Sequence, residues 1–154
     1  FRIKENGNHL IFGTTHLWYK ADAEQEGSEV ARVYQLSLFM DKLEQFKSKY
    51  NCPVIMVGDF NTVYNSDTVQ SAIKRGYTHA YHLATDYRDE TCGHHVCNSD
   101  HYERYDNPMT FNEAIDHILT KDMPNDSVKS FDRYYPDYYF PLSDHFPVFI
   151  DVDI

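Results

Sequence analysis

VIMVGDFN, residues 54–61, joins four apolar residues to a glycine and then to a short polar end. Four consecutive apolar residues without polar alternation predict a strand that is covered on both faces. At its end, Asp59 and Asn61 carry oxygen atoms that can ligate a hard cation or contact a phosphate. The alternative is that both side chains only form a turn, by bonding to their own backbone.

Helices are predicted before and after this strand in the sequence. From Ser28, the expected N-cap, apolar residues recur at helical spacing up to Phe46. A shorter helix is expected over residues 67–75, with Ser66 as its N-cap. Residues 9–17 have the pattern of another strand and follow an Asn-Gly pair that favours a hairpin. This alternation of strands and helices predicts a layered fold of helices and sheets.

Three more strand-like segments carry residues suited to phosphoryl chemistry. His16 stands near the end of the strand predicted over residues 9–17, Asp116 lies inside a short apolar run, and Asp144 and His145 precede the alternating final segment. Asp116 and the Asp144-His145 pair have structural alternatives, because a buried Asp is often satisfied by backbone donors and an Asp-His pair can be a solvated turn. Four such segments in one chain favour a common site.

In their order along the chain, four motifs resemble those of one family. Residues 15–17 (Thr-His-Leu), 58–61 (Gly-Asp-Phe-Asn), 115–118 (Ile-Asp-His-Ile) and 143–148 (Ser-Asp-His-Phe-Pro-Val) are similar to the successive motifs of the endonuclease/exonuclease/phosphatase superfamily, whose best-known member is deoxyribonuclease I. The intervening helix, with Arg32 and Gln35, fits the same pattern. The resemblance implies an α+β fold, a four-layer α/β/β/α sandwich, and cleavage of a phosphate ester by an in-line water with Mg²⁺ or Mn²⁺.

The resemblance also implies roles in proton transfer. His145 matches the catalytic histidine, Asp116 the acid that orients it, and His16 the histidine that binds or protonates at the scissile phosphate. A histidine oriented by a carboxylate is a suitable proton carrier near neutral pH, so elementary chemistry agrees with these roles.

Three further residues are implied around the metal and the phosphate. Asp144 matches a metal-binding carboxylate, Asp59 a residue that holds or activates the attacking water, and Asn61 a contact to the phosphate. We therefore expect Asp144, Asp59 and Asn61 to surround the cation. Such oxygen ligands suit magnesium or manganese better than zinc.

The match covers a single domain, residues 1–154, but only the C-terminal part of the family domain. Members carry, before the Thr-His-Leu motif, an N-terminal half with an Asn on its first strand and a Glu that is the principal metal ligand. Here that motif begins at Thr15, and the chain starts at Phe1 without an initiator Met. We therefore expect the N-terminal half to be missing, and expect the isolated chain to bind metal weakly and turn over little.

Composition limits the partners and the location. A net charge of -10 argues against charge-driven attraction of the whole surface to nucleic acid or membrane. No stretch approaches the roughly 20 apolar residues of a transmembrane segment. Three cysteines, an odd number, favour a reducing compartment such as the cytoplasm and leave a secreted protein open.

Residues 77–110 show no sustained period and predict a long loop. Within it, Cys92 and Cys97 flank two adjacent histidines, which raises a zinc site or a disulfide as alternatives to a plain surface loop. This spacing is not a common zinc arrangement, so the surface loop is preferred.

The sequence favours a divalent-metal-dependent phosphoesterase. Within that class, a phosphodiesterase or nuclease-type hydrolase is preferred. Its substrate would be a nucleotide, a nucleic acid, or a phospholipid or inositol head group. One alternative is a non-catalytic binding module on the same fold. Another is a sphingomyelinase-type or inositol-phosphate-type phosphohydrolase.

Overall fold

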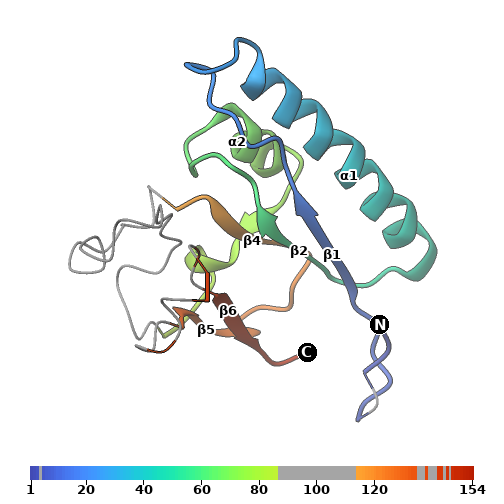
Figure 1. The fold of residues 1–154 in the computed structure, drawn as a ribbon. Coiled ribbons are helices and arrows are strands. Elements are labelled where there is room, and N and C mark those ends of the chain that lie inside the picture. Colours follow the sequence, from blue (N-terminus) through green and yellow to red (C-terminus); the bar gives the residue numbers. More distant parts are fainter. Residues whose placement is uncertain (4, 87–113, 135–137, 139–141, 144, 146) are drawn as a thin grey trace.

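The computed structural model describes residues 1–3, 5–86, 114–134, 138, 142–143, 145 and 147–154. Within them, a four-stranded sheet lies between helices on one face and a two-stranded sheet on the other (Figure 1). The elements are β1 (Ile11–His16), α1 (Ser28–Tyr50), β2 (Val54–Asp59), α2 (Asp67–Lys74), β3 (Thr78–His79), the 3₁₀ turn η1 (Ala80–His82), β4 (Asp116–Lys121), β5 (Val128–Arg133) and β6 (Val148–Val152).

The four-stranded sheet has the order β1-β2-β4-β3. β1 runs parallel to β2, whereas β4 runs antiparallel to β2, so the ends of β1 and β2 meet the beginning of β4. The register pairs His16 with Asp59, and Asp59 with Asp116. Three polar residues that are far apart in the sequence therefore lie side by side at one edge of the sheet.

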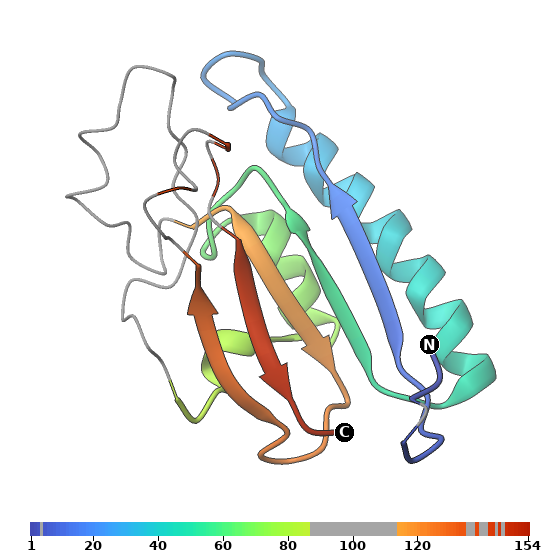
Figure 2. The same cartoon turned by 60° about the horizontal axis from the view of Figure 1, so that its bottom comes forward.

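β2 is covered on both faces, as its apolar run predicts. Val54 and Met56 belong to the core between the sheet and the helices, together with Leu36 of α1. Ile55 faces the second core, beneath the β5-β6 sheet, with Phe131. Figure 2 shows β5 and β6 lying across the face of the sheet that is turned away from α1. Each large apolar side chain buried in this way stabilises the fold by about 1.5–3 kcal/mol.

The helices confirm the predicted periods and correct one boundary. Ser66 caps α2 as expected, because its Oγ accepts a hydrogen bond from the backbone N–H of Val69 at 3.2 Å. Ser28, the predicted N-cap of α1, is instead the first helical residue, and Gly27 is the cap with φ of 85°. The Ser28 hydroxyl contacts Trp18 Nε1 and donates to the carbonyl of residue 25, so it is engaged elsewhere.

The loop prediction for residues 77–110 is wrong at its start, where β3 and η1 form, and residues 87–113 lie outside the described residues. The zinc and disulfide alternatives for Cys92 and Cys97 fall on that undescribed part. β5 pairs antiparallel with β6 and was not predicted. Among the described residues, no helix has the length and apolar character needed to cross a membrane.

Candidate active site

The edge where β1, β2 and β4 meet carries a cluster of carboxylates and histidines. His16, Asp59 and Asp116 all occupy the sheet face that packs against β5 and β6, by the alternation of strand residues. His145 joins them from the segment before β6. Its Nδ1 lies 2.8 Å from Asp116 Oδ2, and its Nε2 lies 3.8 Å from Asp59 Oδ2. His16 Nε2 lies 3.4 Å from the same Asp59 oxygen.

Gly58 permits this convergence because no other residue fits there. Its φ is 150°, and an added Cβ would stand 1.8 Å from the carbonyl oxygen of Thr15 on the neighbouring strand. Pairing also continues past the strand ends, since Leu17 N–H donates to Asp59 O at 3.0 Å and Phe60 N–H donates to Ile115 O at 2.8 Å. The backbone of Asp59 is thereby held from both neighbouring strands.

The turn after Asp59 uses the side chains in the way that the turn alternative predicts. Asn61 has a left-handed backbone, with φ of 52°, and its N–H donates to Asp59 Oδ1 at 2.8 Å. Its side-chain Nδ2 donates to Leu17 O at 3.1 Å. One carboxylate oxygen of Asp59 is therefore fixed by the turn, while the other, Oδ2, faces His16 and His145. The turn is therefore present, and it is compatible with a site role for both residues, which stays a prediction.

Burial raises the pKa of Asp59, and the hydrogen bond from Asn61 N–H opposes that rise. The nearby Asp116 carboxylate raises the same pKa further, while His145 and His16 lower it. A half-buried carboxylate beside a second carboxylate is poorly solvated in its charged form. A cation placed between them would relieve that cost.

Three of these residues could hold such a cation. Asp59, Asp116 and His145 each offer a ligand atom, and the three atoms lie within 4.8 Å of one another. Two carboxylates are the usual protein contribution to a magnesium site, so Asp59 and Asp116 fit the expected metal. The imidazole of His145 is a ligand more typical of transition metals. Asp144, the predicted metal ligand, lies outside the described residues. The individual roles predicted for the site residues stay predictions.

The Asp116–His145 contact decides how the imidazole can act. A carboxylate accepts hydrogen bonds, so the proton lies on His145 Nδ1 and the Nε2 atom of the neutral ring is a base. A cavity of about 310 Å³ adjoins this pair, lined in part by Gly58, Ser143 and Pro147. The pair thus stands at the wall of a space that a small substrate group could enter.

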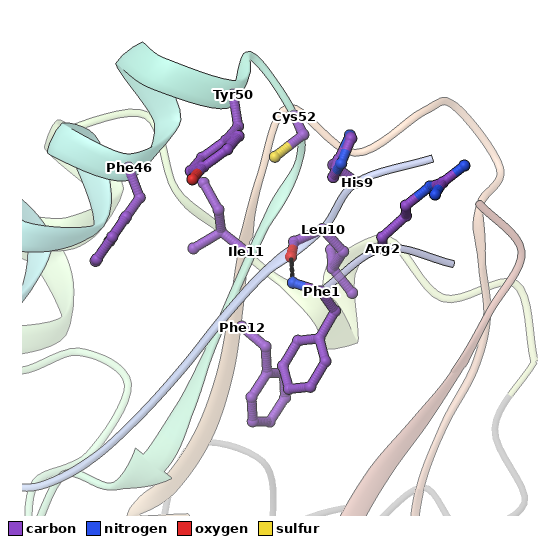
Figure 3. A pocket seen from close by; sticks show the side chains of 9 residues that line it. All are labelled: Phe1, Arg2, His9, Leu10, Ile11, Phe12, Phe46, Tyr50 and Cys52. Carbon is purple, nitrogen blue, oxygen red and sulfur yellow. Dashed lines mark hydrogen bonds between the residues drawn. The ribbon is translucent and has the colours of Figure 1, made fainter. Parts of the chain in front are cut away.

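A larger cavity, of about 490 Å³, lies at the opposite end of β1 (Figure 3). Its walls are mainly aromatic and aliphatic, and none of its lining residues is a carboxylate: Phe1, Arg2, His9, Leu10, Ile11, Phe12, Phe46, Tyr50 and Cys52. Residues 13–15 of β1 separate the lining residue Phe12 from His16, a backbone length of about 13 Å. Size alone therefore does not mark the reactive end of the sheet.

Arg32 and Gln35, which fit the family pattern, hold the segment that follows His16. Arg32 is 4% exposed and donates to Lys20 O at 2.6 Å and to Glu29 Oε2 at 2.8 Å. Gln35 Oε1 accepts from Trp18 N–H at 2.9 Å. Glu29 is not among the predicted residues, although its spacing of three residues from Arg32 on one helix indicates an ion pair.

No family model and no curated relative matches the chain, but solved structures do. A mannosyl-6-phosphatase of Bacteroides thetaiotaomicron is 24% identical, with a TM-score of 0.71, over 99% of this chain and 54% of its own. An endonuclease/exonuclease/phosphatase of Bacteroides vulgatus is 20% identical, with a TM-score of 0.70, over 99% and 52%. The human Nocturnin catalytic domain is 21% identical, with a TM-score of 0.65, over 99% and 50%.

These neighbours confirm the predicted resemblance at the level of the fold. The chain has the α+β, deoxyribonuclease-I-like fold of endonuclease/exonuclease/phosphatase proteins. It spans about half the length of the structures it matches. The described residues supply one helical layer and the two sheets of the expected four-layer sandwich, and a second helical layer is not among them.

Proposed function

We propose that this chain forms the catalytic half-site of a divalent-metal-dependent phosphoesterase. The observation that carries the proposal is the convergence of His16, Asp59, Asp116 and His145 at one edge of the sheet, with the Asp116–His145 hydrogen bond at 2.8 Å. The fold of phosphatases and nucleases supports the same class of reaction.

In the proposed reaction, Asp116 accepts a hydrogen bond from the Nδ1–H of His145 and holds the ring, so that Nε2 is directed toward the reacting phosphate. His145 can then transfer a proton through Nε2, a contribution of about 10²–10⁴-fold in such reactions. A bound Mg²⁺ or Mn²⁺ would supply positive charge to the phosphate oxygens. Asp59 and Asp116 would hold that ion, and we propose Asp144 as a further carboxylate.

The remaining residues act around the phosphate. Asp59 Oδ2, fixed by the turn that binds its other oxygen, would orient the attacking water. Asn61 would contact the phosphate from the same turn. His16 has a side chain that is 70% exposed and lies on the open side of Asp59, where it could meet a phosphate oxygen or the leaving group. The positions of these residues at the shared edge support each proposed role.

The proposed chemistry is compatible with more than one phosphate ester. A phosphodiester of a nucleotide, nucleic acid, or phospholipid or inositol head group is the leading substrate class. A phosphomonoester on a sugar is a second candidate, because one structural neighbour is a mannosyl-6-phosphatase. Because the chain spans about half the length of the structures it matches, we also propose that efficient turnover needs further sequence that would complete the metal site.

Turnover by the full-length protein tests this proposal. Its substrates would be p-nitrophenyl phosphodiesters, oligonucleotides, inositol phosphates, sphingomyelin and mannose 6-phosphate, each with Mg²⁺ or Mn²⁺. We expect His145→Ala and Asp59→Asn to lower kcat by about 10²-fold or more, with melting temperatures within a few degrees of wild type. The control His9→Ala removes an exposed histidine at the other cavity and should retain activity.

Activity that survives either site substitution would refute the assigned roles. Metal binding without turnover of any of these substrates would support the binding-module alternative instead. The isolated 154-residue chain should turn over little under the same conditions. Full activity of that chain would contradict the proposed need for further sequence.

A further inference from the structure

Behind the site lies a pair of buried histidines that the proposed reaction does not use. His79 of β3 and His117 of β4 are each 1% exposed, and His79 Nε2 lies 3.1 Å from His117 Nδ1. His117 alternates with Asp116 along β4, so its side chain lies on the opposite face of the sheet. There its Nε2 lies 2.8 Å from Thr62 O, in the loop after β2.

The hydrogen-bond partners of the two histidines determine which ring nitrogen of each carries the proton. The backbone N–H of Tyr81 can only donate, so His79 Nδ1 accepts from it at 3.2 Å and His79 carries its proton on Nε2. That proton is donated to His117 Nδ1, which leaves the proton of His117 on Nε2. The carbonyl of Thr62 can only accept, which agrees with this direction. Both rings are neutral and donate toward the loop.

Electrostatics support the neutral state of both rings. Burial lowers the pKa of His117 to about 4, while the Thr62 carbonyl and Asp116 oppose that fall. Burial also lowers the pKa of His79 well below its ordinary value, with His117 and His82 acting in the same direction.

Thr62 is fixed from a second direction. Its hydroxyl donates to Glu29 Oε2 of α1 at 3.3 Å, while its carbonyl accepts from His117 of the sheet. The preceding residue, Asn61, has the left-handed φ of 52° and bonds Asp59 Oδ1. Asn adopts such a backbone more readily than most non-glycine residues, so its surroundings need only select it. The contacts to Thr62 are well placed to do so.

We infer that His117, oriented by His79, is a positioning residue that holds Thr62, and through it Asn61 and Asp59, in the geometry of the site. Its effect on catalysis rests on the proposed function; its effect on the loop does not. The alternative is that the pair only satisfies polar atoms in the core.

Two substitutions separate these alternatives. His117→Gln keeps a donor that can reach Thr62 O and an acceptor for His79, whereas His117→Phe keeps an aromatic ring but has neither. In the full-length protein, we expect His117→Phe to lower kcat roughly 10- to 100-fold with little change in KM, and His117→Gln to restore most of it. Equal kcat in the two variants, at any melting temperature, would overturn the inference.

NMR of the chain itself gives a second test that needs no activity. Ring ¹⁵N spectra at pH 7 should show the Nε2–H tautomer for both His79 and His117. The amide signals of Asp59 and Asn61 should move in His117→Phe and stay near wild type in His117→Gln. An Nδ1–H tautomer of His117, or unmoved amides in His117→Phe, would overturn the inference. If instead the wild type lacks turnover while these spectra agree, only the proposed function fails.

Discussion

Acid should destabilise this protein through its buried histidine pair. Burial lowers the pKa of His117 to about 4 in the folded chain, from the ordinary value of 6.5 that applies to the unfolded chain. Between these values the unfolded chain binds the proton and the folded chain does not, so the free energy of unfolding falls as pH falls. From pH 7 to pH 5, His117 alone accounts for a loss of about 2 kcal/mol. His79 contributes in the same direction.

Urea unfolding at the two pH values measures this loss. Comparison with His117→Gln isolates the histidine, because the opposing contribution of Asp59, whose pKa is raised, is present in both proteins. We expect the variant to lose about 2 kcal/mol less than wild type between pH 7 and pH 5. The control His9→Gln removes an exposed histidine and should behave as wild type. An equal loss in wild type and His117→Gln would refute the reasoning.

Three further substitutions test the residues that support the site. Gly58→Ala should lower the free energy of unfolding by well over about 1 kcal/mol, because its Cβ would lie 1.8 Å from a backbone oxygen. The control Gly27→Ala, also at positive φ but with nothing within 4 Å, should lose less stability in the same urea experiment. Asp59→Asn should leave the metal-free chain at least as stable in thermal unfolding, since the buried charge is removed, yet weaken Mn²⁺ binding in calorimetry; lower stability together with unchanged binding would contradict this. Arg32→Met should cost roughly 3 kcal/mol, because it leaves Glu29 without its buried partner, and a loss near zero in urea unfolding would show that the pair does not matter.

Local sequence patterns correctly predicted the buried strand β2 and the N-cap of α2. The apolar run of residues 54–57 is covered on both faces, and Ser66 caps α2. β5 escaped prediction because Lys129, Ser130 and Asp132 interrupt its apolar residues, although Ser130 and Asp132 are buried. β5 is a strand because it pairs with β6, and its composition does not predict that pairing.

The candidate site also combines residues that local sequence predicts with contacts that only the tertiary fold reveals. Residue type and strand position placed His16 and Asp59 near strand ends and Asp116 inside a short strand, whereas β4 begins at Asp116. Only the sheet register makes the three residues neighbours. The contact between Asp116 and His145 joins residues 29 positions apart and was expected from the family resemblance alone. The bond from His117 to Thr62 spans 55 positions, and no local pattern announces it.

Paramagnetic broadening by Mn²⁺ tests the central claim most directly, because it locates a cation even where binding is weak. The amide signals of the 154-residue chain would be followed as Mn²⁺ is added at low concentration. The site predicts that the amides of Asp59, Asp116 and His145 broaden first, and that Asp59→Asn removes this preference. Earlier broadening at other acidic residues, or an unchanged pattern in Asp59→Asn, would contradict a metal site at this edge of the sheet.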